Sequence, residues 1–274
     1  MNFAKQDIHQ FQGTVWEYYH DHGRHDLPWR SPEPSGQFDP YKIVVSEVML
    51  QQTQVARVIV KYGEFLERFP AVEVLAKAQL GEVLRAWNGL GYNRRAKFLH
   101  LAAKQITDEY EGKFAKDNTE LVRLPGIGAN TAGAILAYAF NQPIAFLETN
   151  IRTVFIRHFF HDQADISDKE ILSLVEQTLD HEHPREWYWA LMDYGSYLKQ
   201  TVGNVNRQSK SYSRQSKFAG SHRQIRGQVL RLLGDKSMTH EQLGQQIEDD
   251  RLAQVIDELL QESLVVKTGS TLSL

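Results

Sequence analysis

A short glycine-containing turn between two helical patterns constrains the fold of this chain more than any other feature. The turn is Leu124-Pro125-Gly126-Ile127-Gly128, with a helical pattern over residues 118–123 before it and an apolar helix over residues 130–136 after it. Two glycines around one apolar residue leave backbone amides free, and such amides at a helix N-terminus bind an anion without a basic side chain. Gly126, Ile127 and Gly128 therefore predict a helix–hairpin–helix motif that holds a DNA phosphate without reading sequence. An ordinary helix–helix connection is the alternative.

Helical spacing of apolar residues dominates the rest of the chain, so we expect an all-α fold. Asp39-Pro40 predicts a helix start, because an N-cap is followed by Pro at the first helical position. This helix runs through Val44, Val45, Val48 and Met49, and further helices are expected over residues 8–19, 54–68, 79–87 and 92–111. Residues 222–274 predict three further helices and a short hairpin that turns at Gly269. This tail resembles a winged-helix module.

The composition excludes several kinds of site. The chain has 274 residues and no cysteine, which rules out thiol nucleophiles, iron–sulfur clusters and thiolate zinc sites. The histidines show no metal-ligand spacing, so we expect no metal and no cofactor. No stretch approaches the roughly 18 apolar residues of a membrane span. Because the N-terminus also has no apolar signal core, we expect a cytoplasmic, nucleoid-associated protein without a membrane partner.

The net charge of −3 argues weakly against nucleic acid, but its distribution does not. Residues 201–231 carry seven basic and no acidic side chains, and this basic segment can follow a phosphate backbone or be a solvated linker. Residues 232–274 carry a net charge of −5, which makes DNA binding by the tail itself doubtful. A packing role or a protein partner is at least as well supported for that module.

Five motifs in order resemble adenine mismatch glycosylases of the MutY type, in the endonuclease III-like helix–hairpin–helix superfamily. They are Leu27-Pro28-Trp29-Arg30, residues 46–55, Gly89-Leu90-Gly91-Tyr92, the glycine turn, and Leu147-Glu148-Thr149-Asn150-Ile151-Arg152. The resemblance covers roughly residues 10–200. It implies two helical lobes with double-stranded DNA in the cleft between them.

The resemblance also suggests the domain boundaries. Residues 1–30 and 146–200 would form one lobe and residues 31–145 a six-helix barrel lobe, with the hairpin motif at 118–140. Members of this family usually carry an iron–sulfur cluster, and the basic residues 201–221 would take its place here. Residues 222–274 would form the winged-helix-like module. We expect a monomer.

Two glutamates are the candidate catalytic acids. A glycosylase flips the nucleotide out of the duplex, protonates the departing base and stabilises an oxocarbenium-like sugar. Glu47 matches the family's acid/base glutamate and lies on an apolar helix, where burial would raise its pKa. Glu148 stands where the family has aspartate, so the carboxylate reaches about 1.5 Å further in a geometry that tolerates little displacement. Asn150 matches a family asparagine that helps to hold the reacting centre.

Further site residues follow from the resemblance and from their chemistry. Asn130 stands where the endonuclease III branch has a Schiff-base lysine, so we expect no lysine-dependent strand cleavage. The candidates for the base pocket and for insertion into the duplex are Trp29, Arg30, Gln51, Gln52, Thr53, Tyr92 and Asn130. The candidates for phosphate binding, besides the glycine turn, are Arg94, Arg95, Arg207, Lys210, Arg214 and Lys217. A solvated helix face is the alternative for Arg94 and Arg95.

Two departures bear on the substrate. The family's four cluster cysteines are missing after Met192-Asp193-Tyr194-Gly195, and the domain that recognises 8-oxoguanine is replaced by the tail. The resemblance, together with Asn130, implies a monofunctional DNA glycosylase of base excision repair that acts on adenine opposite 8-oxoguanine or guanine. The alternatives are a glycosylase for uracil or thymine mismatches or another damaged base, and a non-catalytic protein that binds DNA lesions.

Overall fold

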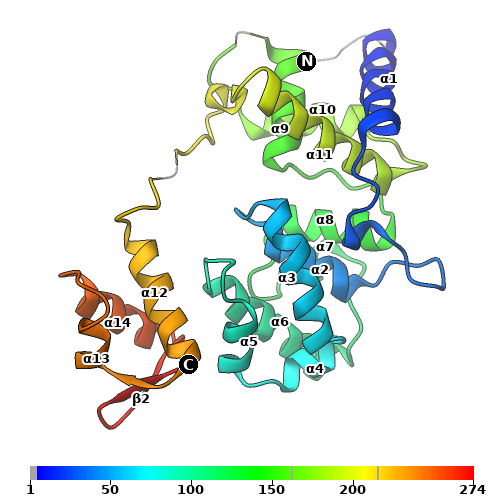
Figure 1. The fold of residues 1–274 in the computed structure, drawn as a ribbon. Coiled ribbons are helices and arrows are strands. Elements are labelled where there is room, and N and C mark those ends of the chain that lie inside the picture. Colours follow the sequence, from blue (N-terminus) through cyan, green and yellow to red (C-terminus); the bar gives the residue numbers. More distant parts are fainter. Residues whose placement is uncertain (1–4, 162, 215) are drawn as a thin grey trace. The chain divides into compact units, whose positions relative to one another are not determined.

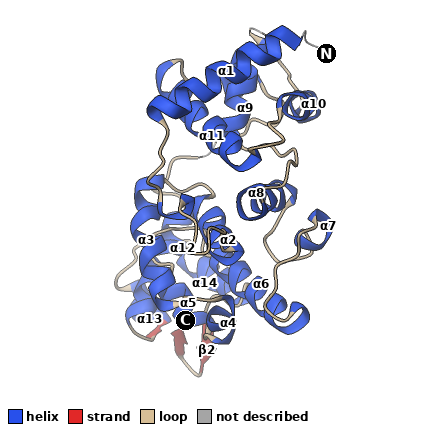
Figure 2. Ribbon diagram, turned by 90° about the vertical axis from the view of Figure 1, so that its right-hand side faces the viewer, coloured by secondary structure: helices blue, strands red, loops and turns tan. Residues whose placement is uncertain are grey.

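The structure is a computed structural model that describes residues 5–161, 163–214 and 216–274, and helices make up most of it (Figures 1 and 2). It divides into two compact units that interleave along the chain. The first comprises the described residues up to Ile43, then Lys116–Val122 and Ile127–Arg214. The second comprises Val44–Ala115, Arg123–Gly126 and residues 216–274. No helix in the described part of the chain is long and apolar enough to cross a membrane.

The first unit is built around α11, which packs against α9 and α1. Its core is rich in aromatic rings: Phe11 lies 5.3 Å from Phe155 and 4.9 Å from Phe159, measured between ring centroids. Trp187 and Tyr188 of α11 are fully buried in the same core. The elements are α1 (Lys5–His22), the 3₁₀ turn η1 (Pro28–Arg30), α7 (Asn118–Leu121), α8 (Ala129–Phe140), α9 (Thr149–Phe155), the π-helical turn η2 (Ile156–Phe160), α10 (Asp168–Thr178), α11 (Pro184–Thr201) and the 3₁₀ turn η3 (Val205–Gln208).

Helix α2 (Pro40–Leu50) starts where the sequence predicted. The Asp39 carboxylate accepts a hydrogen bond from the backbone nitrogen of Tyr41 at 2.8 Å, so Asp39 caps the first turn. The second unit contains α2 from Val44 onward, followed by α3 (Val55–Arg68), α4 (Val72–Lys77), α5 (Leu80–Ala86) and α6 (Arg94–Tyr110). Phe65 and Trp87 meet edge to face at 5.9 Å in its core.

The tail forms the expected winged-helix-like module. It contains α12 (His222–Asp235), β1 (Met238–Thr239), α13 (His240–Gly244), α14 (Leu252–Gln261), β2 (Val266–Thr268) and β3 (Thr271–Ser273). The strands form an antiparallel sheet in the order β1-β3-β2, in which Met238 pairs with Leu272 and Val266 with Ser273. The hairpin turns at Gly269, whose φ of +61° is the left-handed conformation that glycine adopts without strain. Strand β1 was not predicted.

The module belongs to the second unit, where α12 packs against α5. The Arg85 guanidinium donates a hydrogen bond of 3.0 Å to the carbonyl oxygen of Gly234. Gly81 of α5 lies so close to Leu274 that an added Cβ would be 2.8 Å from the Leu274 oxygen.

The predicted all-helical fold with a hairpin motif and a winged-helix-like module is confirmed, whereas the predicted domain boundaries stay predictions. In the structure, α8 and residues 31–43 group with the first unit. Helix α8 groups with the first unit because of its apolar side chains: Ala134, Ala137 and Tyr138 belong to the same core as Phe146 and Trp187. A helix packs with the core that covers its apolar residues, whatever its place in the sequence.

Candidate active site

Glu47 lies near the C-terminal end of α2 in the second unit. Its neighbours Ser46, Val48 and Met49 are buried, and Glu47 itself is half-buried. The helix is apolar nearly throughout, so burial holds it in place and leaves Glu47 as its one acidic side chain. The predicted setting of a carboxyl group on an apolar helix is therefore present.

Arg95 fixes the end of that helix and two loops. Its guanidinium donates to the carbonyl oxygens of Val48 at 2.7 Å, Met49 at 2.9 Å and Gln51 at 2.6 Å. It also donates to Thr53 Oγ1 at 3.1 Å and to the carbonyl oxygens of Leu90 at 3.1 Å and Gly91 at 3.0 Å. The carbonyl groups at the end of a helix have no partner within the helix, and Arg95 supplies one.

This arrangement corrects the prediction that Arg95 binds a DNA phosphate. The side chain is buried, and burial lowers its pKa to about 10. Both terminal nitrogens of the guanidinium donate to oxygens of the protein. Arg95 therefore positions Glu47 and the residues predicted to enter the duplex, while the neighbouring Arg94 is exposed.

The two loops that Arg95 holds carry residues predicted to enter the duplex. Gln52 and Tyr92 both have positive φ, +55° and +47° respectively, which is uncommon for residues other than glycine. Gln52 is exposed, Gln51 and Thr53 are half-buried, and Tyr92 is 37% exposed. The structure thus brings these four side chains onto adjacent loops of one unit, tied together by one arginine.

Glu148 stands at the start of α9 in the first unit, as the residue just before the first helical turn. It is half-buried, and burial raises the pKa of its carboxyl group. The backbone N–H of Thr149 and the charge of Arg152 act against this rise. The Arg152 guanidinium is itself held by Asp168, at 3.1 and 2.9 Å.

Asn130 holds the segment that carries Glu148. Its carboxamide oxygen accepts a hydrogen bond of 3.2 Å from the backbone nitrogen of Leu147. Asn130 lies in the first turn of α8, directly after the glycine turn. The hairpin motif and the candidate carboxylate are therefore connected by one side chain.

Asn150 lies against α11, where a glycine makes room for it. An added Cβ on Gly195 would clash with the backbone of Asn150, so only glycine allows this close packing of α9 on α11. The Lys199 ammonium group donates to the Asn150 side-chain oxygen at 3.5 Å, and burial lowers the pKa of Lys199.

The glycine turn has the predicted form. Gly126 has a φ of +78°, and an added Cβ would be 2.7 Å from the Cβ of Phe98. Ile127 is 5% exposed, as expected of an anchor, whereas Gly128 is exposed and caps α8 with ordinary backbone angles. Asp117 caps the preceding α7 by accepting from the backbone nitrogen of Thr119 at 2.9 Å.

The chain is similar to proteins of base excision DNA repair. Residues 45–179 match the model of the HhH-GPD superfamily base excision DNA repair protein family. An adenine DNA glycosylase of Mycolicibacterium smegmatis is 35% identical, over 92% of this chain and 91% of that protein.

The chain belongs to the adenine DNA glycosylase family.

Another curated relative and a solved structure match part of this chain. The adenine DNA glycosylase of Buchnera aphidicola subsp. Baizongia pistaciae is 38% identical over 69% of this chain, which spans 52% of that relative. A solved thermostable thymine-DNA glycosylase shares the fold, with a TM-score of 0.60 and 23% identity over 70% of this chain and 87% of its own. This family member thus spans about half the length of several curated relatives and nearly all of one.

The family resemblance implies an iron–sulfur cluster after α11, but the residues of this adenine DNA glycosylase family member do not fit one. The segment after α11 offers no thiolate, and within the described residues no three His, Asp or Glu side chains gather as metal ligands. Hydrogen bonds hold the segment instead. The buried Asn206 donates to Thr153 Oγ1 at 2.8 Å and to the Thr149 carbonyl oxygen at 3.3 Å. Ile166 and Ser209 form a parallel bridge.

The basic side chains on this segment differ in their surroundings. Arg207, Lys210, Arg214 and Lys217 are all exposed, which phosphate binding requires. Arg226 instead forms ion pairs with Glu258 at 3.2 Å and with Glu262 at 2.5 Å. Only some of the basic side chains of this segment are therefore available to bind phosphate.

Arg30 is a second correction. Its side chain is 4% exposed and forms a two-point ion pair with Asp193, at 2.7 and 2.9 Å. Arg24 donates to the same carboxylate, so this pair of arginines keeps the pKa of Asp193 low although burial acts to raise it. Arg30 therefore joins η1 to α11 and does not face a base. The predicted role of Trp29 in the base pocket stays a prediction, and the residue is 6% exposed.

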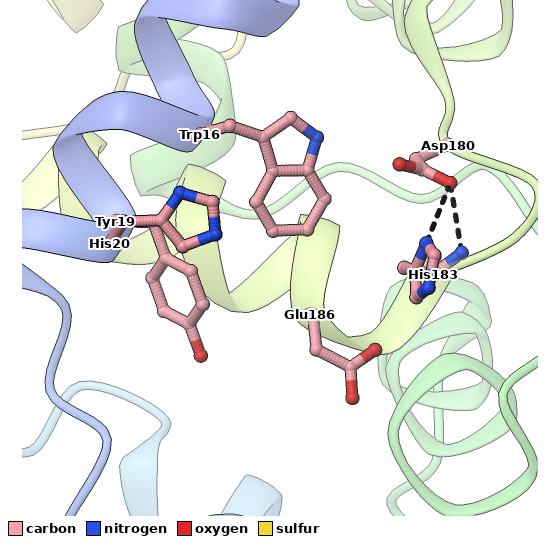
Figure 3. A pocket seen from close by; sticks show the side chains of 6 residues that line it. All are labelled: Trp16, Tyr19, His20, Asp180, His183 and Glu186. Carbon is pink, nitrogen blue, oxygen red and sulfur yellow. Dashed lines mark hydrogen bonds and ion pairs between the residues drawn. The ribbon is translucent and has the colours of Figure 1, made fainter.

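A pocket of about 500 Å³ in the first unit involves none of the predicted site residues. Trp16, Tyr19 and His20 of α1 line it together with Asp180, His183 and Glu186 (Figure 3). Asp180 accepts from the backbone nitrogen of His183 at 2.8 Å, which orders the start of α11. This pocket, Asn206 and the role of Asn130 toward Leu147 were missed because their partners are 17 to more than 160 residues away in sequence.

Proposed function

We propose that this protein is a monofunctional DNA glycosylase of base excision repair that removes adenine opposite 8-oxoguanine or guanine. The observation that carries the proposal is the setting of Glu148. This carboxyl group is half-buried at the start of α9, with Asn130 holding the residue before it and Gly195 admitting the helix that follows. Similarity to an adenine DNA glycosylase over 91% of that protein's length supports the choice of substrate.

In the proposed reaction, Glu47 gives its proton to a ring nitrogen of the flipped adenine. The bond between the base and C1′ then breaks, and its electron pair leaves with the base. The carboxylate of Glu148 stabilises the positive charge left on the sugar, as the second carboxyl group does in glycosidases. Water attacks C1′ and gives a proton to the Glu47 carboxylate, which restores Glu47 and leaves an abasic site.

DNA binding in this proposal rests on two groups of residues. The glycine turn presents exposed backbone around the start of α8, and a helix N-terminus favours an anion. The exposed Arg207, Lys210, Arg214 and Lys217 add positive charge where relatives would carry the cluster loop.

The absence of a lyase step rests on Asn130. A Schiff base needs an amine, and the carboxamide of Asn130 has none that is nucleophilic. Its oxygen accepts from Leu147, which gives the side chain a positioning role. Incubation with abasic DNA and borohydride should trap no covalent complex through residue 130.

The second candidate function is a non-catalytic protein that binds DNA lesions. The observation that favours it also concerns Glu148. Burial raises the pKa of this group, which disfavours the charged form that a catalytic carboxylate needs. A glycosylase for uracil or thymine mismatches would use the same two glutamates on a different base.

The test is a panel of duplexes, each with one altered base, incubated with the protein and then cleaved with alkali. We expect cleavage at adenine opposite 8-oxoguanine or guanine. Glu47→Gln should lower the single-turnover rate by about 10²–10⁴-fold, because a positioned general acid contributes that much. Glu67→Gln, an exposed glutamate on α3, is the matched control and should retain the rate. Release of uracil or thymine alone would replace adenine as the substrate, and tight lesion binding without base release would favour the non-catalytic candidate.

A further inference from the structure

The C-terminal module is attached to the start of α6 by a cluster of charged groups within the second unit. The backbone carbonyl of Glu262 accepts from Lys97 at 2.5 Å, and the Glu262 carboxylate lies 3.5 Å from Arg94. Arg226 of α12 pairs with the same carboxylate at 2.5 Å. The acidic charge of the tail is thus used partly to pack the module beside the loop that ends at Tyr92.

A second contact joins the module directly to that loop. Arg223, in the first turn of α12, donates from Nη1 to the Tyr92 hydroxyl at 2.5 Å. Its guanidinium carbon lies 5.6 Å from the centroid of the Tyr92 ring. The other terminal nitrogen, Nη2, donates to the carbonyl oxygen of Ser216 at 2.8 Å, which orients the guanidinium.

The Tyr92 ring is thereby held at both ends. Arg95 donates to the carbonyl oxygen of Gly91 and lies 5.7 Å from the ring centroid, which restrains the backbone side. Arg223 restrains the hydroxyl side. Tyr92 is still 37% exposed, so part of the residue stays accessible from outside the protein. A side chain held in its bound conformation loses less entropy when it binds.

We propose that Arg223 is a positioning residue for Tyr92, through which the C-terminal module takes part in reading the base opposite the flipped nucleotide. The inference rests on the proposed function, because it needs Tyr92 to stack within the duplex. A ring fixed by two arginines meets the opposite base in one orientation, so correct and incorrect partners differ more in stacking and contact. The module would then contribute to recognition through one arginine and not through a recognition helix of its own.

The experiment compares Arg223→Ala, Arg223→Lys, Tyr92→Phe and the double variant Arg223→Ala/Tyr92→Phe. Single-turnover rates of adenine release are measured with 8-oxoguanine, guanine or cytosine opposite. Arg223→Ala should reduce the preference among opposite bases by about fivefold, a size typical of coupled neighbours. Tyr92→Phe should have the same effect, and the double variant should be no worse than either. Arg223→Lys should recover part of the preference. Lys236→Ala removes an exposed cation at the end of the same helix and should change nothing.

A second readout separates this proposal from the proposed function. 2-Aminopurine placed beside the opposite base becomes more fluorescent when the base stack is opened, whether or not any base is released. We expect the rise on protein binding to be smaller for Arg223→Ala and for Tyr92→Phe. If no duplex loses a base, the proposed function fails while this measurement still tests the role of Arg223.

Two results would overturn the proposal. One is an unchanged fluorescence rise in Arg223→Ala. The other is a loss of DNA affinity that is equal for all duplexes and persists in the Tyr92→Phe background. That second pattern would make Arg223 a phosphate ligand, because a phosphate contact is indifferent to the base and independent of the Tyr92 hydroxyl.

Discussion

The side chain of Asn130 accepts a hydrogen bond of 3.2 Å from the backbone nitrogen of Leu147, the residue before Glu148. Asn130 belongs to the helix that begins at the glycine turn, so the segment expected to hold a phosphate also holds the backbone beside a candidate catalytic carboxylate. Placement of the phosphate and placement of Glu148 are thereby connected through one amide.

Asn130→Ala should lower the single-turnover rate of base release by about tenfold, since small displacements of a catalytic group are costly. Asn130→Asp keeps the acceptor oxygen and should retain more of the rate than alanine does. Quenched-flow or gel assays at saturating protein would measure both. Equal rates for Asn130→Ala and the unaltered protein would show that the hydrogen bond does not position Glu148.

Glu148→Gln should abolish most base release and yet raise the melting temperature at neutral pH. Burial raises the pKa of Glu148 above its ordinary value of 4.5, so between those two values the folded protein binds more protons than the unfolded chain. Stability contributed by this group is present below pH 4.5 and is lost as the pH rises through the raised pKa. The variant's advantage in melting temperature should therefore grow with pH over that window. Calorimetry at several pH values tests this, and an advantage that is largest at low pH would contradict it.

Arg95→Lys should destabilise the protein by about 3 kcal/mol. An ammonium group cannot reach the six oxygens that the guanidinium serves, so carbonyl groups at the end of α2 lose their partner. Urea unfolding monitored by circular dichroism gives the free energy. Arg94→Lys, one residue earlier and exposed, is the matched control and should change it by less than about 0.5 kcal/mol. A null result for Arg95→Lys would mean that water replaces these contacts.

Asn206→Ala should cost about 1–3 kcal/mol and also slow base release. Asn206 is buried, and its loss leaves the hydroxyl of Thr153 and the carbonyl oxygen of Thr149 without this donor. Because Thr149 follows Glu148, the first turn of α9 should loosen. A rate measured well below the melting temperature distinguishes this effect from unfolding. Loss of stability with an unaltered rate would confine Asn206 to a structural role.

Replacing the exposed basic residues in pairs should flatten the salt dependence of DNA affinity. Each phosphate contact contributes a slope of about −0.9 in log K against log salt, so Arg207→Ala/Lys210→Ala should reduce the slope by up to about two. Arg214→Ala/Lys217→Ala should act alike. Lys104→Ala, exposed on α6, serves as the control in fluorescence anisotropy titrations. A slope unchanged by both pairs would show that the segment is a solvated linker.

Local patterns predicted a large part of this fold. Asp39 and Pro40 marked the start of α2, and apolar spacing located α3, α5 and α6 to within a few residues. The glycine turn and the hairpin at Gly269 were also correct, since a positive φ is a local requirement that glycine meets. Strand β1 was missed because two residues carry no detectable period.

The roles of Arg30 and Arg95 could not be predicted in the same way. An arginine next to a motif is as consistent with a phosphate ligand as with a buried donor, and the distinction depends on which oxygens surround it. For Arg95 these are the carbonyl groups of two loops, and for Arg30 the carboxylate of Asp193, 163 residues further along the chain.

The sequence by itself determined the chemistry available to this protein: two glutamates in the family's motif positions, a glycine turn, no thiolate and an amide where a lysine would be nucleophilic. These follow from residue type, which is independent of the fold. The tertiary structure decided which charges remain accessible and which position other groups. Arg95 and Arg30 are buried donors, Arg223 donates to Tyr92, and Asn206 donates hydrogen bonds to residues of α9. Burial and hydrogen-bond partners arise from contacts between distant segments, and no local pattern records them.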